Sequence, residues 1–230
     1  MPIPYKTALI VGAGHGISAA LARLLAAQGM TVGLAARDIG KLEKLSKETG
    51  AMLFSCDASR PDEVERLFAD ADARLGEPDV VVYNASRRLR GPISELDPEK
   101  VHAAIDVTAY GAFLVVKQAA LRMEAKGRGA ILLTGATASI KGFALSAPFA
   151  MGKFALRGLA QSAARELGPK GIHVAHFIID GSVRSNSRPD DGRDAHLDPE
   201  DIARSYLDVL RQGRSAWSHE VELRPWLESF

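Results

Sequence analysis

Three glycines within five positions, Gly12, Gly14 and Gly16, follow a short apolar run near the N-terminus. Glycine lets a backbone turn tightly and approach a phosphate, and a helix behind such a turn offers free N–H groups to the anion. The strict GxGxxG spacing is not met, because Ile17 stands where the third glycine would be. An apolar strand before the turn and a helix after it still favour a dinucleotide-binding turn. The alternative is a glycine turn that only reverses the chain.

The end of the second expected strand indicates which dinucleotide would bind. An NAD site needs a carboxylate there to bind the ribose 2′-OH, but this chain has Ala36. Arg37 follows, and its guanidinium suits the 2′-phosphate of NADP. His15, inside the glycine turn, could supply a second donor. We therefore expect NADP(H) to be preferred, while Asp38 keeps NAD(H) possible and a solvated Arg37 is the structural alternative.

Apolar strands and amphipathic helices alternate along the whole chain, which predicts a parallel sheet with helices on both faces. The fold class is thus α/β, a single-domain Rossmann-like doubly wound sheet of about seven strands over residues 1–230. We expect strands at 7–11, 31–36, 52–55, 79–83, 130–134, 173–179 and 220–223, and helices at 17–28, 39–48, 61–75, 98–126, 149–167 and 199–211.

Bulk composition excludes several classes of protein. The 230 residues include 29 Lys and Arg against 28 Asp and Glu, so the net charge of +1 favours neither nucleic acid nor an anionic membrane. No apolar run reaches eighteen residues, and the N-terminus lacks the apolar core of a signal peptide. The single cysteine, Cys56, excludes an internal disulfide, and we find no metal-ligand constellation. We expect a cytoplasmic protein.

Two segments fall outside this regular alternation. Residues 181–196 are polar and rich in turn formers, and they follow a strand whose carboxyl end should border the ligand. They are either a substrate-side lid or a disordered surface loop. Residues 217–230 hold both tryptophans and the expected edge strand. This tail either forms a subunit interface or packs on its own subunit.

From residue 7 to about 223 the chain resembles the short-chain dehydrogenase/reductase family. The family motif TGxxxGIG is represented by VGAGHGIS at 11–18, NNAG by YNAS at 83–86, and PG by Asp180-Gly181. The family's adenine-contacting aspartate is matched by Asp57. The resemblance and the glycine turn together imply a cofactor site made of Gly12, Gly14, His15, Gly16, Ile17, Arg37, Asp57, Ala58, Asn84, Ala85, Lys153 and Gly181.

The resemblance also implies four catalytic positions, normally Tyr, Lys, Ser and Asn. The YxxxK signature is here Phe149 to Lys153, so the lysine is retained and the tyrosine is not. Ala136 occupies the serine position and Thr108 the asparagine position. A phenyl ring cannot transfer a proton, and general acids contribute on the order of a hundredfold to ten-thousandfold in rate. Lys153 is therefore expected to bind the cofactor first of all.

Nearby side chains could substitute for the missing groups. Hydroxyls at Thr137, Ser139 and Ser146 could bond a substrate oxygen, although they are poor acids. Tyr110 should point away from the site on its helix, and Tyr83 is expected to pack or to lie near the adenine. The histidines at 173 and 176 lie in a buried strand, where core histidines are commoner than catalysts.

Three functions remain open at this stage. The first is an NADP(H)-binding oxidoreductase acting on a carbonyl or alcohol, with a proton from water, Lys153 or the substrate. The second is an inactive dinucleotide sensor or scaffold, and the third is a lyase or isomerase. Whether the chain is an enzyme, and which small molecule is its substrate, stay undecided. The resemblance implies that the helices at 98–126 and 149–167 form a four-helix interface in a homodimer or homotetramer.

Overall fold

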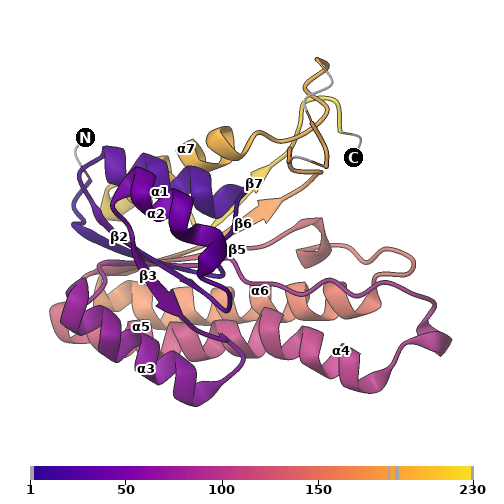
Figure 1. Cartoon of the computed structure of the whole chain (residues 1–230), viewed down its shortest axis with the longest axis horizontal. Coiled ribbons are helices and arrows are strands. Elements are labelled where there is room, and N and C mark those ends of the chain that lie inside the picture. Colours follow the sequence, from indigo (N-terminus) through magenta and orange to yellow (C-terminus); the bar gives the residue numbers. More distant parts are fainter. Residues whose placement is uncertain (1–2, 186, 190–191, 229–230) are drawn as a thin grey trace.

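The chain forms one seven-stranded parallel sheet between two layers of helices (Figure 1). The computed structural model describes residues 3–185, 187–189 and 192–228. The strand order is β3-β2-β1-β4-β5-β6-β7, which confirms the predicted fold class. The strands are β1 (Thr7–Val11), β2 (Thr31–Ala36), β3 (Met52–Ser55), β4 (Val80–Tyr83), β5 (Gly129–Thr134), β6 (Ile172–Ile179) and β7 (Glu220–Leu223).

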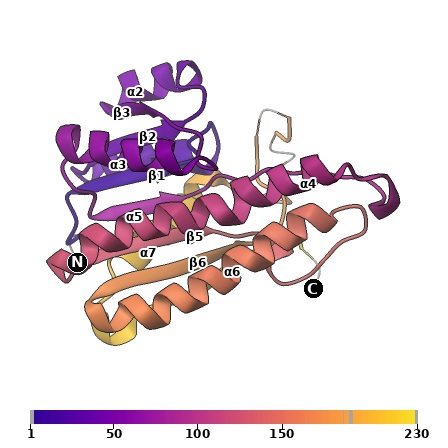
Figure 2. The ribbon, with the colours of Figure 1, turned by 90° about the horizontal axis from the view of Figure 1, so that it is seen from below.

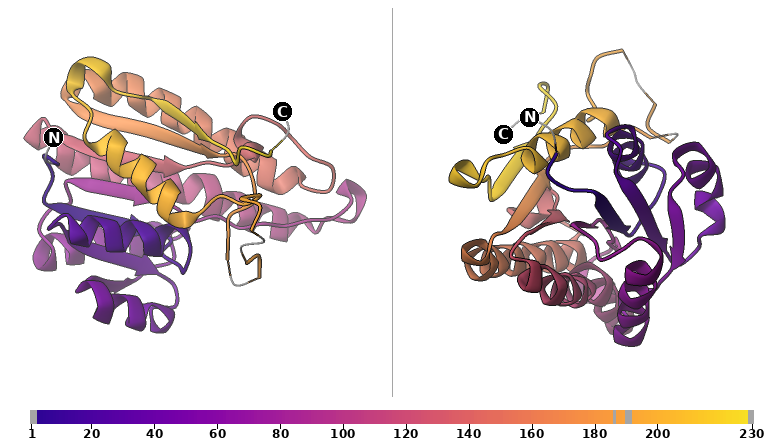
Figure 3. Two further views of the ribbon diagram at one scale, coloured as in Figure 1. Left: turned by 90° about the horizontal axis from the view of Figure 1, so that it is seen from above. Right: turned by 90° about the vertical axis from the view of Figure 1, so that its left-hand side faces the viewer.

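Helices cover both faces of this sheet, as the end-on view of Figure 3 shows. α1, α2 and α7 lie on one face, and α3, α5 and α6 lie on the other. Alternate residues of a strand supply the two cores: Leu9 packs toward the α5 side and Ile10 toward the α1 side. The helices are α1 (Ile17–Ala27), α2 (Glu43–Thr49), α3 (Pro61–Arg74), α4 (Pro98–Ile105), α5 (Gly111–Lys126), α6 (Ala147–Leu167) and α7 (Pro199–Leu210).

The single helix predicted at 98–126 is divided by one π-helical turn, Asp106–Tyr110, between α4 and α5. Figure 2 shows this run lying alongside α6. α5 begins at Gly111, where a Cβ atom would lie 2.6 Å from both the Ala58 carbonyl oxygen and the Tyr83 hydroxyl. Glycine thus allows the helix to approach the sheet closely at this point.

By length and hydropathy alone, Pro98–Lys126 could also cross a membrane, with 44% of its most apolar window buried. In this fold α5 packs its apolar side chains, among them Leu114, Val115 and Met123, against the sheet. A helix in the core of a protein passes the same test of composition.

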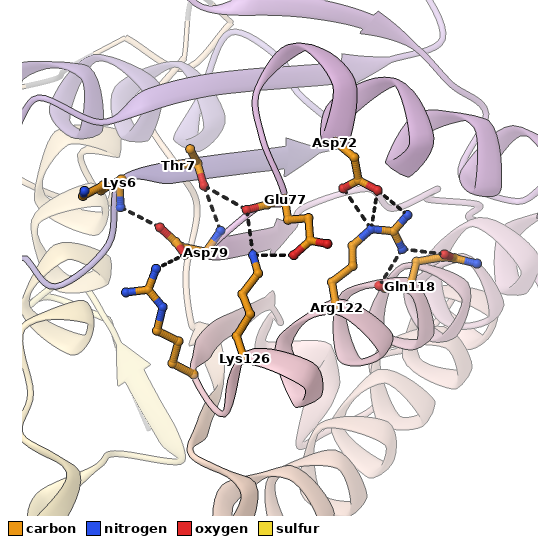
Figure 4. Close-up of polar contacts among 9 residues, drawn as sticks. Lys6, Thr7, Asp72, Glu77, Asp79, Gln118, Arg122 and Lys126 are labelled. Carbon is orange, nitrogen blue, oxygen red and sulfur yellow. Dashed lines mark hydrogen bonds and ion pairs between the residues drawn. The ribbon is translucent and has the colours of Figure 1, made fainter.

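The amino end of the sheet is held by a polar network around Asp79 (Figure 4). The buried Asp79 carboxylate accepts the Lys6 backbone N–H at 2.8 Å and the Arg128 guanidinium at 3.2 Å. Its own N–H donates to the Thr7 hydroxyl at 2.9 Å, and that hydroxyl donates to the Glu77 carbonyl. These bonds explain why β4 begins at Val80, one residue later than predicted, since Asp79 is engaged in this network.

The loop after β6 and the C-terminal tail extend from the same end of the sheet (Figures 1 and 3). The Trp217 ring stacks on His173 with centroids 4.6 Å apart, so the start of the tail packs on its own subunit. Trp226 remains 78% exposed. Residues 186, 190 and 191 of the predicted loop, and 229–230 of the predicted tail, lie outside the described residues.

The network at the amino end yields a test of stability. Asp79→Ala leaves the Lys6 N–H without its acceptor and Arg128 without its partner. We expect the free energy of unfolding in urea to fall by about 2–3 kcal/mol. The control is Glu77→Ala, which removes only the Lys126 ion pair, whose partners are 25% and 48% exposed; its loss should stay below about 1 kcal/mol. Equal losses in the two variants would show that Asp79 has no special role.

Candidate functional site

The predicted site residues gather at the carboxyl ends of the strands, where two cavities meet. The first, of about 310 Å³, is lined by Gly12, Arg37, Asp57, Ala58 and Ala85 and is called the Arg37 cavity. The second, of about 220 Å³, is called the Lys153 cavity and is lined by Lys153 and by Ile17, Ala136, Phe149 and Gly181. Both are bordered by Asn84 and Ser86. The two cavities therefore lie end to end across the sheet edge.

The glycine turn fits the demands of a bound pyrophosphate. Gly12 has φ +82°, and a Cβ atom there would lie 2.3 Å from the Ala85 backbone nitrogen. α1 begins after Gly16 without a side-chain cap and without an acidic residue in its first turn. A Cβ atom on Gly14 or Gly16 would meet nothing within 4 Å, so the space above the helix end is open. Uncapped N–H groups beside open space form an anion-binding arrangement. His15 is exposed beside them.

The Arg37 cavity carries an available positive charge. Arg37 is exposed, and no described residue forms an ion pair with it. The Asp38 carboxylate instead pairs with Lys41 at 2.9 Å, which lowers the pKa of Asp38. Burial raises the pKa of Asp57, but hydrogen bonds from Ser59 and the charge of Arg37 outweigh it and lower the pKa overall. The carboxylates of Asp38 and Asp57 thus already have partners, whereas the Arg37 guanidinium is free to donate hydrogen bonds to a phosphate.

Ser18, which replaces the last glycine of the family motif, links the glycine turn to the end of β4. The Asn84 side-chain amide donates to the Ser18 hydroxyl at 2.7 Å, and that hydroxyl donates to the Gly12 carbonyl at 3.4 Å. The Asn84 backbone N–H donates to the Val11 carbonyl at 2.8 Å. No local pattern in the sequence indicates this contact, because it depends on how β1 and β4 lie in the sheet.

Lys153 is buried at the other end of the site. The residue is 3% exposed, and its ammonium donates to the Thr134 carbonyl at 2.6 Å. Burial, together with the positive charge of Arg88, lowers the pKa of Lys153 to about 7. The Phe149 ring centroid lies 5.8 Å from the Lys153 nitrogen, and Ala136 packs on the same ring. Phe149 and Ala136, the positions for which the resemblance implies a tyrosine and a serine, carry no hydroxyl.

Arg88 is a site residue that the sequence analysis missed. Its guanidinium lies 4.7 Å above the centroid of the Phe149 ring, and it lines the Lys153 cavity. Partial burial, and then the charges of Arg188 and Arg90, lower its pKa. A signal was present, because arginine occupies positions 87, 88 and 90 directly after the Asn84 strand end.

Thr108 lies outside both cavities. It is fully buried in the π-helical turn, and its hydroxyl accepts the Arg87 backbone N–H at 3.2 Å. A Cβ atom on Gly152 would lie 2.8 Å from the Thr108 Cβ, so α6 packs tightly against this turn. The third position implied by the resemblance is therefore near Lys153 in the fold but faces the packed interior.

The three hydroxyl residues considered as substitutes for the missing catalytic groups differ in their accessibility. The Ser139 hydroxyl is buried, accepts the Ala136 N–H at 3.2 Å and lies 3.3 Å from the His176 ring. It is therefore engaged within the core. Thr137 and Ser146 line a third cavity next to the Lys153 cavity and remain accessible to a ligand.

The tyrosines and histidines considered from sequence do not line the Lys153 cavity. Tyr83 is buried, and its hydroxyl donates to the Val107 carbonyl, consistent with a packing residue. Tyr110 is 44% exposed. The two histidines are core residues. His173 stacks on Trp217, and burial lowers the pKa of His176 to about 4.

Comparisons with known proteins agree on the family. A family model described as short chain dehydrogenase matches residues 6–193. The 2,5-dichloro-2,5-cyclohexadiene-1,4-diol dehydrogenase of Sphingobium indicum is 31% identical over 232 residues, covering 97% of this chain and 90% of its own. A short-chain dehydrogenase structure from Rhodopseudomonas palustris is 36% identical, with a TM-score of 0.83 over 96% of this chain and 99% of its own. A metagenomic short-chain oxidoreductase in complex with NADP is 28% identical, with a TM-score of 0.87 over 99% of this chain and 100% of its own.

The burial of Lys153 predicts a specific dependence of stability on pH. Its pKa is about 7 in the folded chain and about 10.4 in an unfolded chain. Between these values the unfolded state binds more protons, so the Lys153 contribution to stability rises as the pH increases from 7 to 10 and is constant below 7. Lys153→Met removes this slope. We expect the variant to be more stable than the wild type near pH 6, by roughly 3 kcal/mol, with the gap closing toward pH 10.

Urea unfolding at several pH values measures this difference. The matched control is Lys117→Met on the exposed face of α5, whose stability curve should run parallel to that of the wild type. Parallel curves for the wild type and Lys153→Met would mean that Lys153 is not buried as a charge.

Proposed function

The chain belongs to the short-chain dehydrogenase/reductase family of oxidoreductases, and on that premise we propose that it binds NADP(H) and interconverts a carbonyl and an alcohol without a catalytic tyrosine. The observation that carries this proposal is the pair of adjoining cavities. One ends at the unpaired Arg37 and the other at the buried Lys153. A dinucleotide is an elongated ligand whose two ends need these two kinds of surroundings.

The chain's own residues account for each part of the cofactor. The pyrophosphate would lie on the uncapped start of α1, next to Gly14 and Gly16. Arg37 would hold the 2′-phosphate, with His15 as a second donor. Bound NADP(H) would supply or accept a hydride. The NADP complex of the metagenomic relative supports this choice of cofactor. Asp57 and Ala58 would lie at the adenine, and Ile17, Asn84, Ala85 and Gly181 would border the pyrophosphate and nicotinamide.

Lys153 is the proposed proton carrier. An ammonium with a pKa of about 7 releases its proton far more readily than an ordinary lysine, because burial disfavours its charge. The Thr134 carbonyl fixes the nitrogen in place while leaving two of its protons for other acceptors. A substrate oxygen in the Lys153 cavity could accept one of them. Water or the substrate itself is the alternative proton source.

A second function is favoured by the two apolar side chains at the reaction centre. Phe149 and Ala136 pack together without a hydroxyl, and the Thr108 hydroxyl faces Arg87. A chain with this centre could bind the dinucleotide as a sensor or scaffold and transfer no hydride. Binding without turnover distinguishes this function from the first one.

Self-association is proposed on separate grounds. α5 and α6 expose Phe113, Leu121, Met151 and Phe154, each between 45% and 61% accessible. Apolar side chains of this size favour burial against another surface. A second copy of the chain, joined through these helices, would bury them in a homodimer or homotetramer.

The cofactor proposal predicts that Arg37 discriminates between the two dinucleotides. Arg37→Leu should weaken NADPH binding by about 10- to 100-fold, because a charged hydrogen bond to the 2′-phosphate is lost. NADH lacks that phosphate, so its affinity should change little. Fluorescence titration measures both dissociation constants. Arg165→Leu, at the far end of α6, is the control and should alter neither. Equal weakening of NADPH and NADH would contradict the assignment of Arg37.

If the chain is an oxidoreductase, it should oxidise NADPH with a carbonyl substrate, and restoring the two hydroxyls should raise that rate. NADPH oxidation should be detectable with some member of a panel of aldehydes, ketones and quinones. Restoring both hydroxyls with Phe149→Tyr and Ala136→Ser should raise the rate by about a hundredfold, since a tyrosine acid would act beside Lys153. Tight NADPH binding with no turnover on any compound would favour the sensor instead. An unchanged rate in the double variant would mean that the substrate pocket itself has diverged.

A further inference from the structure

A third cavity, of about 320 Å³, continues from the Lys153 cavity and is called the Arg90 cavity. The two share Arg88, Ala136, Phe149, Ile179 and Gly181 in their linings. None of the glycine-turn residues lines the Arg90 cavity. A molecule with its reacting carbon near Lys153 would therefore extend into this space, away from the cofactor.

The charge around these two cavities is positive. Arg88 and Arg90 line the Arg90 cavity, and Lys153 and Arg188 line the Lys153 cavity. No aspartate or glutamate is among the described residues that line either one. The net charge of the whole chain is only +1, so this concentration is local.

Among the residues that the structure describes, no carboxylate neutralises these three arginines. Within the described part of the chain, the side chains of Arg88, Arg90 and Arg188 form no ion pair or hydrogen bond, and the Arg88 guanidinium lies over the Phe149 ring. Arginines elsewhere do find partners, such as Arg157 with Glu220 at 2.6 Å. Partial burial, and then repulsion from the charges of Arg188 and Arg90, lowers the pKa of Arg88. An anion in the cavity would relieve that repulsion.

The surroundings also suit an oxyanion in shape and polarity. A guanidinium presents paired donors that match a carboxylate or phosphate. The hydroxyls of Thr137 and Ser146 line the same space and can donate further hydrogen bonds. Phe143 and Phe149 provide an apolar wall for the remainder of the molecule. The proposed sites for the cofactor phosphates, Arg37 and the start of α1, are separate from this cavity.

We propose that the substrate is an anion, a carbonyl compound or the matching alcohol that carries a carboxylate or phosphate bound by Arg88 and Arg90. This inference rests on the proposed function, because it assigns the substrate class of the same site. Arg88 borders both cavities, so the oxyanion and the reacting carbon belong to one small molecule, as in an oxoacid.

The anion would also affect the proposed proton carrier. The charge of Arg88 disfavours the ammonium form of Lys153. A carboxylate bound to Arg88 would offset that charge and favour protonation of Lys153. Substrate binding would thereby favour the protonated form of Lys153 before its proton is transferred to the substrate oxygen.

Matched pairs of probes test the proposal. Benzoylformate and its methyl ester share a ketone and a ring but differ in charge, and glyceraldehyde 3-phosphate and glyceraldehyde form a second pair. Calorimetric titration of the protein saturated with NADP+ measures binding without turnover. We expect at least one anion to bind about 10- to 100-fold more tightly than its neutral partner. Arg90→Met should remove most of that ratio, Arg90→Lys should retain part of it, and Arg165→Met should leave it unchanged.

The outcomes separate this proposal from the proposed function. A preference only in the phosphate pair identifies a phosphate ester as the substrate, and a preference only in the carboxylate pair identifies an oxoacid. Arg90-dependent anion binding without NADPH oxidation would support the anion site and contradict the oxidoreductase. Reduction of the neutral compounds, with no anion preference in either pair, would overturn the anion site and leave the oxidoreductase standing. An anion preference that remains in the Arg90→Met variant would also overturn the proposed anion site.

Discussion

The close approach of two backbone turns, at Gly12 after β1 and at Ala85 after β4, is the constraint on which the site depends. No side chain can stand on Gly12, because its Cβ would lie 2.3 Å from the Ala85 nitrogen. β1 and β4 are neighbours at the centre of the sheet, and their connections leave toward opposite edges. The chain therefore opens a crevice at this point, as doubly wound sheets do. The Ser18–Asn84 hydrogen bond holds the two sides of the crevice in register.

The two halves of the crevice differ in chemical character. The Arg37 half combines a glycine turn, an uncapped helix and one available guanidinium, which are features of anion binding. The Lys153 half has Phe149 and Ala136 where the resemblance implies hydroxyl side chains, and it buries an ammonium whose pKa is about 7. Arg88 lies on the ring of Phe149, where the resemblance implies a tyrosine. In the reaction that we propose, positive charge takes the place of hydroxyl chemistry.

The sequence predicted the sheet well because buried parallel strands are short apolar runs, such as residues 79–83 and 173–179. Sequence-based prediction was less accurate where contacts between distant segments determine the local conformation or the surroundings of a side chain. The π-helical turn at Asp106–Tyr110 has ordinary helix-forming neighbours, so no local pattern distinguishes it from the predicted single helix. The Ser139 hydroxyl lies beside the ring of His176, 37 residues away, a core contact that the local sequence around Ser139 does not indicate. Arg88 was visible as a basic run, but its place on Phe149 depends on how the fold brings the segment after β4 to the start of α6.

The central claim is that a hydride passes between the dinucleotide and a substrate carbon in this altered site. The most direct measurement uses NADPH deuterated at both C4 positions, with mass spectrometry of the product formed from a carbonyl compound. We predict one deuterium on the carbon that bears the new hydroxyl. A protein that binds NADPH but leaves every tested carbonyl compound unreacted, or forms an alcohol without deuterium, would contradict the claim.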